Sequence, residues 1–323
     1  MRTYPDMRMR RLRKSAELRE AFSETRVDLA KMVMPLFVDE NIRAPVEIEN
    51  MPGIYRYPIE QAIERAKEYE GLGIKSILLF GVPKYKDSVG SSSYDANGVV
   101  QRAIRGIKNE TDLIVWADLC LCEYTDHGHC GLIKDGGIDN DSTLDIYAKI
   151  ATSYASAGVD GVAPSGMMDG QVARIRKELD INGYVDTLIM AYSSKFASSL
   201  YAPFRSAVNS APSFGDRKTY QMNFRNRREA LREIEEDIEE GADIVMVKPA
   251  LFYLDLVREA RDNFNLPIAA YSVSAEYSMI KNAGDNGIID LKSVVDESLT
   301  AIFRAGADIV ISYFTEYYAR TWK

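Results

Sequence analysis

One phrase recurs along the chain: a helix-like stretch ends in a small-residue turn with a Gly, and a β-branched or aromatic apolar run follows at once. It stands at YEGLGIKSILLFG (69–81), SAGVDGVAPSG (156–166), EEGADIVMVKPA (239–250) and RAGADIVISYF (304–314). A Gly just past a helix can adopt the left-handed conformation that ends the helix. The run after it is too short for a helix and has the composition of a strand buried on both faces. The phrase therefore predicts a helix followed directly by a buried strand.

Four further apolar runs have the same composition, at 32–38, 112–120, 187–195 and 267–274. Together, the eight runs predict strands that begin near residues 32, 74, 112, 159, 187, 243, 267 and 308. Apolar residues at three- and four-residue spacing predict amphipathic helices between most of these strands. The clearest of these helices are expected at 59–72, 142–158, 226–241, 252–264 and 292–306.

Strands that alternate with helices require a parallel sheet with right-handed crossovers. Eight such units over roughly 290 residues match a closed (β/α)8 barrel, the TIM barrel. An open, doubly wound sheet is the alternative, but MPLFVDENI (34–42), around the end of the first strand, contains no Gly-rich phosphate loop. We therefore expect an α/β protein in which residues 26–323 form a TIM-barrel catalytic domain.

Residues 1–25 do not share this alternation and contain too few apolar residues to form a core. They are rich in arginine, at Arg2, Arg8, Arg10, Arg11 and Arg13. Such a segment is either a solvated tail or an arm that packs on another subunit. The residues alone leave both interpretations open.

Composition excludes several classes of protein. The chain has 323 residues, of which 46% are hydrophobic and 27% charged, as in ordinary globular proteins. Its net charge of −8 provides no basic field for a nucleic acid. No apolar run approaches the roughly 20 residues of a membrane span, and the N-terminus lacks a signal-peptide core. We expect a cytoplasmic enzyme with no nucleic-acid or membrane partner.

The three Cys and two His residues of the chain all lie in one window, from Cys120 to Cys130. An odd, clustered set of cysteines is a poor disulfide framework and indicates metal or thiol chemistry in a reducing compartment. Three thiolates suit Zn²⁺, and its fourth position stays free for water, substrate or a His. The window follows a predicted strand end, which favours a catalytic site over a structural one. His127 and His129 either support this site or are merely exposed, and we do not expect them to bind the metal.

Barrel enzymes place their chemistry at the carboxyl ends of the strands. Polar and reactive side chains gather at these ends, namely Asp118, Cys120, Cys122, Ser165, Lys195, Lys248, Ser274 and Tyr313. Lys195 and Lys248 end neighbouring strands, which lie about 4.8 Å apart in a sheet. Burial and the like charge of the other lysine both lower a lysine pKa, and the resulting neutral amine is the nucleophile of Schiff-base chemistry. The alternative is that each lysine points into water or meets a carboxylate.

A long segment, 198–223, follows the fifth predicted strand and is rich in Ser, Pro, Gly and aromatic residues. Segments of this length are often active-site lids. Arg205 and Arg217 on such a lid would bind a substrate carboxylate in bidentate fashion. An exposed loop with ordinary surface arginines is the alternative.

With these features assembled, the sequence resembles the porphobilinogen synthase (δ-aminolevulinate dehydratase) family. The resemblance runs from RMRRLRKS to the C-terminus, and its most specific motifs are DLCLCEYTDHGHCG, VAPSGMMDG, YSSKFASSLYAPFR, SFGDRKTYQMN, MVKPA and YSVSAEY. It implies a hydro-lyase that condenses two 5-aminolevulinate molecules to porphobilinogen in tetrapyrrole biosynthesis, which leads to heme, chlorophyll and cobalamin. It also implies a homo-oligomer, usually an octamer, in which the N-terminal arm wraps a neighbouring subunit.

The resemblance also implies roles for individual residues. Lys248 would form the principal Schiff base and Lys195 the second, and the catalytic zinc ligands would be Cys120, Cys122 and Cys130. The carboxylate of one substrate would be held by Arg205, Arg217 and Gln221, and that of the other by Ser274 and Tyr313. Asp118 and Ser165 fall on further active-site positions.

Two positions add to this pattern. Glu233 matches, by spacing, an allosteric Mg²⁺ position of some relatives. Gly166 departs from the pattern, because many relatives carry Asp there, and the departure puts the local hydrogen bonding in doubt.

Two rival functions fit less well. A class I aldolase needs one lysine and no zinc, and a zinc-stabilised interaction protein would have a closed four-ligand site.

Overall fold

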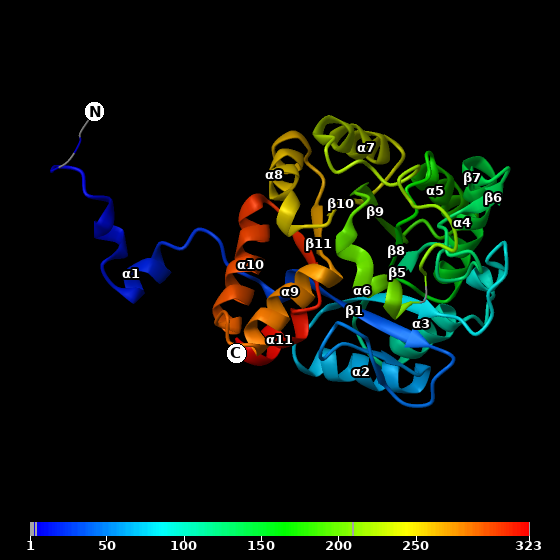
Figure 1. Ribbon diagram of the computed structural model, residues 1–323, viewed down its shortest axis with the longest axis horizontal. Coiled ribbons are helices and arrows are strands. Elements are labelled where there is room, and N and C mark those ends of the chain that lie inside the picture. The colour runs from blue at the N-terminus through cyan, green and yellow to red at the C-terminus, as the bar shows by residue number, and fades with distance from the viewer. Residues whose placement is uncertain (1–2, 4, 209, 323) are drawn as a thin grey trace.

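The computed structural model describes residues 3, 5–208 and 210–322 and shows a closed barrel of eight parallel strands surrounded by helices (Figure 1). The barrel closes where the last strand pairs with the first, with Met32 opposite Val310 and Val33 opposite Ile311. In barrel order the strands are β1 (Met32–Asp39), β4 (Ser76–Val82), β5 (Ile114–Leu119), β8 (Gly161–Pro164), β9 (Leu188–Lys195), β10 (Ile244–Lys248), β11 (Ile268–Ser272) and β12 (Ile309–Ser312). Each begins within two residues of its predicted start, and the predicted (β/α)8 barrel is confirmed.

Helices follow the strands around the outside of the barrel. The helices expected from the sequence are α2 (Ile59–Gly71), α4 (Asn140–Ser156), α7 (Arg227–Glu239), α8 (Leu254–Asn263) and α10 (Leu291–Ala305). The remaining α-helices in the described barrel are α3 (Val99–Glu110), α5 (Gln171–Ile181), α6 (Ala202–Ala207), α9 (Ser274–Asp285) and α11 (Thr315–Thr321). None of the helices in the described ranges combines the length and the hydropathy that a membrane span requires.

The turn glycines of the recurring phrase adopt the conformation expected of them. Gly73, Gly158, Gly241 and Gly306 have φ angles of 89°, 94°, 101° and 121°. A residue with a Cβ is strained in this region, so glycine ends each helix and lets the next strand begin within a few residues. The recurring sequence phrase therefore marks four of the helix-to-strand turns of the barrel.

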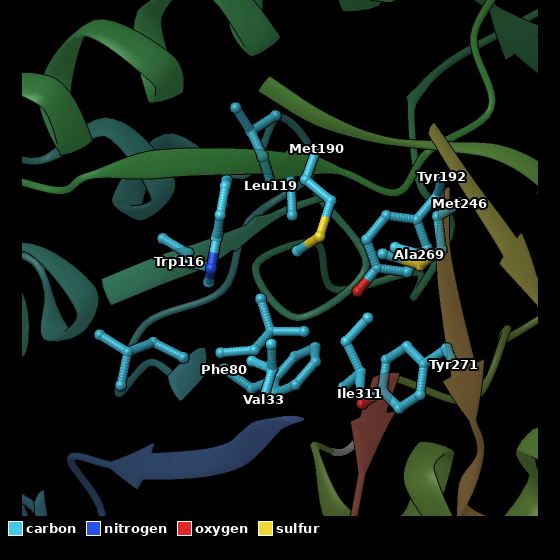
Figure 2. Packing of buried hydrophobic residues seen from close by; sticks show 14 of the residues in the cluster. Val33, Phe80, Trp116, Leu119, Met190, Tyr192, Met246, Ala269, Tyr271 and Ile311 are labelled. Carbon is cyan, nitrogen blue, oxygen red and sulfur yellow. The ribbon is translucent and has the colours of Figure 1, made fainter. Parts of the chain in front are cut away.

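Large apolar side chains fill the barrel interior. Figure 2 shows residues from several strands that meet there, among them Val33, Phe80, Met190, Tyr271 and Ile311. All five are at most 2% exposed. The interior is therefore a packed core, and space for chemistry remains only at the rim.

Short elements occupy places where the sequence indicated only loops. The strands β2 (Val46–Glu47) and β3 (Tyr55–Tyr57) form a small extension beside β1. A hairpin of β6 (Leu132–Lys134) and β7 (Gly137–Asp139) lies between the cysteine window and α4. The hairpin brings the chain from the barrel rim to the start of α4, where the Asp139 side chain accepts a hydrogen bond from the Ser142 amide as an N-cap.

The N-terminal segment forms an arm that reaches away from the barrel (Figure 1). It contains the short helices η1 (Met9–Arg13) and α1 (Ala16–Ala21), and neither contains a buried residue. Its exposed side chains include Met9, Leu12 and Phe22. Arg2 lies outside the described residues. Whether the arm contacts another subunit stays a prediction.

A close contact between two barrel strands generates a test of the core. Gly161 on β8 lies opposite Trp116 on β5, and a Cβ at Gly161 would come within 2.2 Å of the indole ring. We expect Gly161→Ala to lower the free energy of unfolding by about 1–3 kcal/mol, as overpacked cores do. Urea denaturation followed by circular dichroism measures this change.

Gly71→Ala is the matched control, because no heavy atom lies within 4 Å of a Cβ built at the end of α2. It should leave stability unchanged or raise it slightly, since Ala favours helix more than Gly. Equal unfolding midpoints for the two variants would contradict the packing described for β5 and β8.

Candidate active site

The two rim lysines lie side by side at the carboxyl ends of neighbouring strands. Lys195 is the last residue of β9, Lys248 is the last residue of β10, and the two are direct register partners. The register shifts between Val245 and Val247, where β9 contains one more residue than β10. Such a bulge re-aims the side chains that follow it. Both lysines are buried, with exposures of 5% and 6%.

Lys248 points into a box of aromatic rings. Its Nζ lies 4.1 Å from the ring centre of Tyr271, 4.8 Å from that of Tyr192, 5.3 Å from that of Tyr201 and 5.4 Å from that of Phe204. These faces attract a cation, but they replace the water that an ammonium group prefers. Burial and the neighbouring Lys195 lower the pKa of Lys248 to about 7. Near neutral pH, a large fraction of Lys248 is therefore a free amine.

Lys195 is anchored to the end of β8. Its Nζ donates a hydrogen bond to the Ser165 carbonyl, and it lies 5.4 Å from the ring centre of Tyr192. The Ser165 hydroxyl donates to Asp118 Oδ2 at 3.0 Å. Burial raises the pKa of Asp118, and the charges of both lysines oppose this rise. Asp118, Ser165 and Lys195 therefore form one connected polar group.

Many of the predicted site residues line one enclosed cavity at this rim. The cavity has a volume of about 20 Å³, which is room for about one water molecule. Its lining residues are Asp118, Cys122, Glu123, Ser165, Lys195, Tyr201, Phe204, Arg205, Arg217 and Lys248. The structure thus brings both lysines, one cysteine and two arginines of segment 198–223 to a single point.

The three cysteines form a compact buried group beside this cavity. Their Sγ atoms all lie within 4.8 Å of one another, and none is in a disulfide. Cys120 and Cys122 lie just beyond β5, which ends at Leu119, so the turn after the strand aligns them. Thiolates bound to one Zn²⁺ at about 2.3 Å are separated by less than 4.8 Å, so the donor set fits a metal ion.

Electrostatics favour a thiolate at this group. Hydrogen bonds from Cys120 and Cys122, together with the positive charges of Arg217 and Lys195, lower the pKa of Cys130 well below its usual value. Metal ligation by cysteine requires this deprotonated form. Burial raises the pKa of Cys120, and hydrogen bonds with the other two cysteines raise the pKa of Cys122, both well above the usual value. The structure thus prepares one thiolate, at Cys130, and a bound cation would stabilise the other two.

The two histidines hold the surrounding loops and do not belong to the cysteine group. The ring of His129 contacts the Tyr220 hydroxyl through Nδ1 at 3.1 Å and the Phe214 carbonyl through Nε2 at 3.0 Å. His127 Nδ1 accepts from the His129 amide at 3.2 Å. His129 thus connects the cysteine window to the segment 198–223.

Segment 198–223 closes over the cavity. Its first part contains η4 (Ser199–Tyr201) and α6, which pack against α9 (Figure 1). Its later part is held by Arg217, which donates from Nη2 to the carbonyls of Gly128 and Ser210. Asn209 of this segment lies outside the described residues. Segment 198–223 thus forms one wall of the cavity, through Tyr201, Phe204, Arg205 and Arg217, and its role as a lid stays a prediction.

Ser274 and Tyr313 do not line the cavity but lie directly behind its walls. The Ser274 hydroxyl accepts from the Phe204 amide and donates to the Leu200 carbonyl, both at 3.2 Å, and so ties segment 198–223 to α9. The Tyr313 hydroxyl lies 3.2 Å from that of Tyr271, whose ring faces Lys248.

Gln221 and Glu233 line a second, more open cleft of about 570 Å³, which shares no lining residue with the first. Burial and the like charges of Asp169, Glu236 and Glu229 raise the pKa of Glu233 to about 7. Among the described residues, Glu233 belongs to no group of three potential metal ligands. The predicted Mg²⁺ at this glutamate therefore has no support from the geometry.

Buried polar atoms without a hydrogen-bond partner gather around the two clefts. Within the described ranges they include Nε of Arg205 and of Arg217, both amide atoms of Gln221, and Oε1 of Glu123. An unpaired buried polar group is costly, so such atoms mark places where a polar ligand belongs. Arg205 and Arg217 both line the enclosed cavity, and burial together with the like charge of Arg217 lowers the pKa of Arg205.

The sequence reasoning missed several lining residues. Glu123 follows Cys122 directly, and burial together with the charges of Asp118 and Cys130 raises its pKa to about 7. The position of Glu123 inside the cysteine window could have identified it as a site residue. The aromatic residues around Lys248 gave no signal, because aromatic residues on strands and lids usually belong to a core.

Comparison with known proteins places this site in a family. The family model described as "Delta-aminolevulinic acid dehydratase" matches residues 6–321. A relative of that name from Methanothermus sociabilis is 54% identical over 96% of this chain and 97% of its own length. The relative from Archaeoglobus fulgidus is 53% identical over 98% of each chain.

A solved structure agrees with these relatives. The delta-aminolevulinic acid dehydratase (porphobilinogen synthase) of Toxoplasma gondii ME49, in complex with the reaction product porphobilinogen, superimposes with a TM-score of 0.95 at 42% identity. The match covers 97% of this chain and 91% of that one. The barrel, its lysine rim and its cysteine group therefore belong to a member of the delta-aminolevulinic acid dehydratase family, a family of hydro-lyases.

Proposed function

We propose that this enzyme condenses two 5-aminolevulinate molecules to porphobilinogen with loss of two waters. The observation that carries the proposal is the pair of buried lysines in direct register beside a group of three cysteines. The substrate has a keto group for an amine to attack and a carboxylate for the arginines to bind. The T. gondii relative, which binds porphobilinogen as its reaction product, supports this choice of substrate.

Lys248 forms the principal Schiff base in this proposal. Its neutral amine attacks the keto carbon of one substrate, and the adduct loses water to give the imine. The imine makes the adjacent carbon acidic, so that carbon can lose a proton and attack the second substrate. Lys195 forms the second Schiff base in the same way. Asp118 lies near both amines and holds or accepts a proton while Ser165 fixes its Oδ2.

The three cysteines bind the metal, and Zn²⁺ is the ion that thiolate ligands favour. When bound there with an open position, zinc supplies a Lewis acid or a template beside the lysines. The chain prepares the site by burying the three thiols and by placing Arg217 near Cys130. Glu233 stays a prediction as an allosteric Mg²⁺ site.

Two groups of side chains bind the substrate carboxylates. Arg205, Arg217 and Gln221 receive one of them, supported by the unpaired guanidinium and amide atoms of these residues. Ser274 and Tyr313 receive the other after the lid contacts of Ser274 rearrange. A cavity of about 20 Å³ cannot admit 5-aminolevulinate, so the lid opens for entry and closes to exclude water that would hydrolyse the imine.

The arm supports a homo-oligomer. Its exposed Met9, Leu12 and Phe22 offer apolar surface that packing on another copy of the chain would bury. The resemblance to the family favours an octamer.

Borohydride trapping tests the Schiff bases. The enzyme is incubated with 5-aminolevulinate, reduced with borohydride and digested, and mass spectrometry locates the modified lysines. We expect adducts on Lys248 and Lys195. The variant Lys248→Met should lose the adduct at position 248, and its turnover should fall by several orders of magnitude. Lys149→Met, which removes an exposed lysine of α4, should change neither. A wild-type protein without an adduct on either rim lysine would refute the mechanism.

The pH dependence of trapping tests the environment of Lys248. An amine is protonated below its pKa and cannot attack, so the trapping rate at Lys248 should rise through pH about 7, the pKa of Lys248, and level off above it. Lys195→Met removes a like charge, so the midpoint should move to higher pH. Quenched trapping over a pH series measures both curves, and an unchanged midpoint would show that Lys195 does not lower the pKa of Lys248.

Removal of one cysteine tests the metal. Cys122→Ala should reduce bound zinc and activity together, because two thiolates hold zinc far more weakly than three. Elemental analysis of the purified protein, alongside turnover, measures both quantities. Chelated wild-type enzyme that regains activity on zinc addition is the control, and full activity after complete chelation would argue against a catalytic metal.

A further inference from the structure

Helix α4 contacts the metal-binding loop through two buried side chains. The Leu132 amide donates to Thr143 Oγ1 at 2.9 Å, and the Tyr147 hydroxyl donates to the Cys130 carbonyl at 2.6 Å. Thr143 and Tyr147 are both 0% exposed. They are four residues apart and therefore lie on the same face of the helix. The backbone on both sides of Gly131 is thus tied to one rigid element.

The loop lies tightly against this face of α4. A Cβ built at Gly131 would come within 2.8 Å of Thr143 Oγ1 and 2.9 Å of an Ile138 methyl. Such a contact is closer than packed atoms tolerate, so the loop could not take this path with a larger residue. Cys130 lies in the loop between β5 and β6, and its position is therefore set by α4.

The Tyr147 hydroxyl also lies against the end of β8. A Cβ at Gly166 would be 1.8 Å from the Tyr147 oxygen and 2.6 Å from the ring carbon that carries it. Gly166 directly follows Ser165, whose carbonyl accepts the hydrogen bond from Lys195. The phenol therefore occupies the space between the cysteine loop and the residue that anchors a rim lysine.

We infer that Tyr147 is a positioning residue for the three-cysteine metal site, and that Gly166 provides the space its hydroxyl needs. The inference rests on the proposed function, because it takes the cysteines as metal ligands. The hydrogen bond fixes the carbonyl of Cys130, and so limits the places its Sγ can reach. Partners behind metal ligands that act in this way typically contribute about 10–100-fold in metal affinity or activity.

Tyr147→Phe tests the hydrogen bond alone, because it removes the hydroxyl and keeps the ring. Zinc affinity is measured by competition with a chromophoric chelator, and the Co²⁺-substituted protein reports thiolate ligation through its charge-transfer absorption. We expect zinc affinity to fall about 10–100-fold, the cobalt band to shift or weaken, and activity to recover substantially at saturating zinc.

Tyr154→Phe is the matched control. Tyr154 lies on the same helix, is equally buried, and makes its hydroxyl contact with Tyr124 at 3.3 Å rather than with a cysteine. This variant should bind zinc as the wild type does. The melting temperatures of both variants separate a loss of ligand positioning from a loss of stability.

Gly166→Ala tests the second half of the inference. In the wild-type background the new Cβ must displace the Tyr147 hydroxyl, so zinc affinity should fall as it does in Tyr147→Phe. In a Tyr147→Leu background, the hydroxyl that the new Cβ would displace is absent. There, Gly166→Ala should cause little further loss, because the two positions act through one contact.

The outcomes separate the inference from the proposed function. In one outcome, the wild-type protein binds zinc while Tyr147→Phe shows the same zinc affinity and the same cobalt spectrum. That result would overturn the inference and leave the metal site intact. Additive losses for Gly166 and Tyr147 would overturn the role of Gly166. Failure of the wild-type protein to bind zinc at the cysteines would overturn the metal site and the inference with it.

Discussion

The active site depends on the burial of two amines side by side at the mouth of an apolar barrel. Lys195 and Lys248 are register partners on adjacent strands, so neither can move away without disrupting the sheet. Two buried charges of the same sign are unfavourable in a medium that contains almost no water. The surroundings compensate with a carboxylate at Asp118, a backbone carbonyl at Ser165 and the faces of several aromatic rings. This compensation is incomplete, and the remaining unfavourable free energy of the buried charge is expressed as the lowered pKa of Lys248.

The same rim is held together by contacts between loops that are far apart in sequence. His129 and Arg217 link the cysteine window to segment 198–223, Ser274 links that segment to α9, and Tyr147 links the cysteine loop to α4. Most of these contacts use backbone carbonyls and amides as partners. The shape of the site is therefore set by the paths of the loops, and those paths are set by the rigid elements behind them.

The sequence predicted the architecture well because the barrel repeats one local signal. Four of the helix-to-strand turns carry the glycine of the recurring phrase, and every barrel strand has its apolar run, so local chemistry specified the elements and their order. The bulge in β9 that aligns Lys195 with Lys248 has no comparable signal, since it arises from the pairing of two strands. Tertiary packing also determines three further features: the hydrogen bonds between Ser274 and segment 198–223, the separate cleft at Gln221, and the hairpin after the cysteines. Glu123 was within reach, because it lies inside the window that drew attention to the cysteines.

The departure noted at Gly166 has a structural counterpart in the bulk of Tyr147. A side chain at 166 and the phenol at 147 compete for the same space, so the two positions cannot vary independently. A lineage that replaced the glycine first would pass through a protein with a displaced cysteine loop. One that first exchanged the tyrosine for a smaller residue would lose a single hydrogen bond and keep its packing open for the next change. In this chain, the order in which the two positions change therefore decides whether the cysteine loop is disturbed on the way.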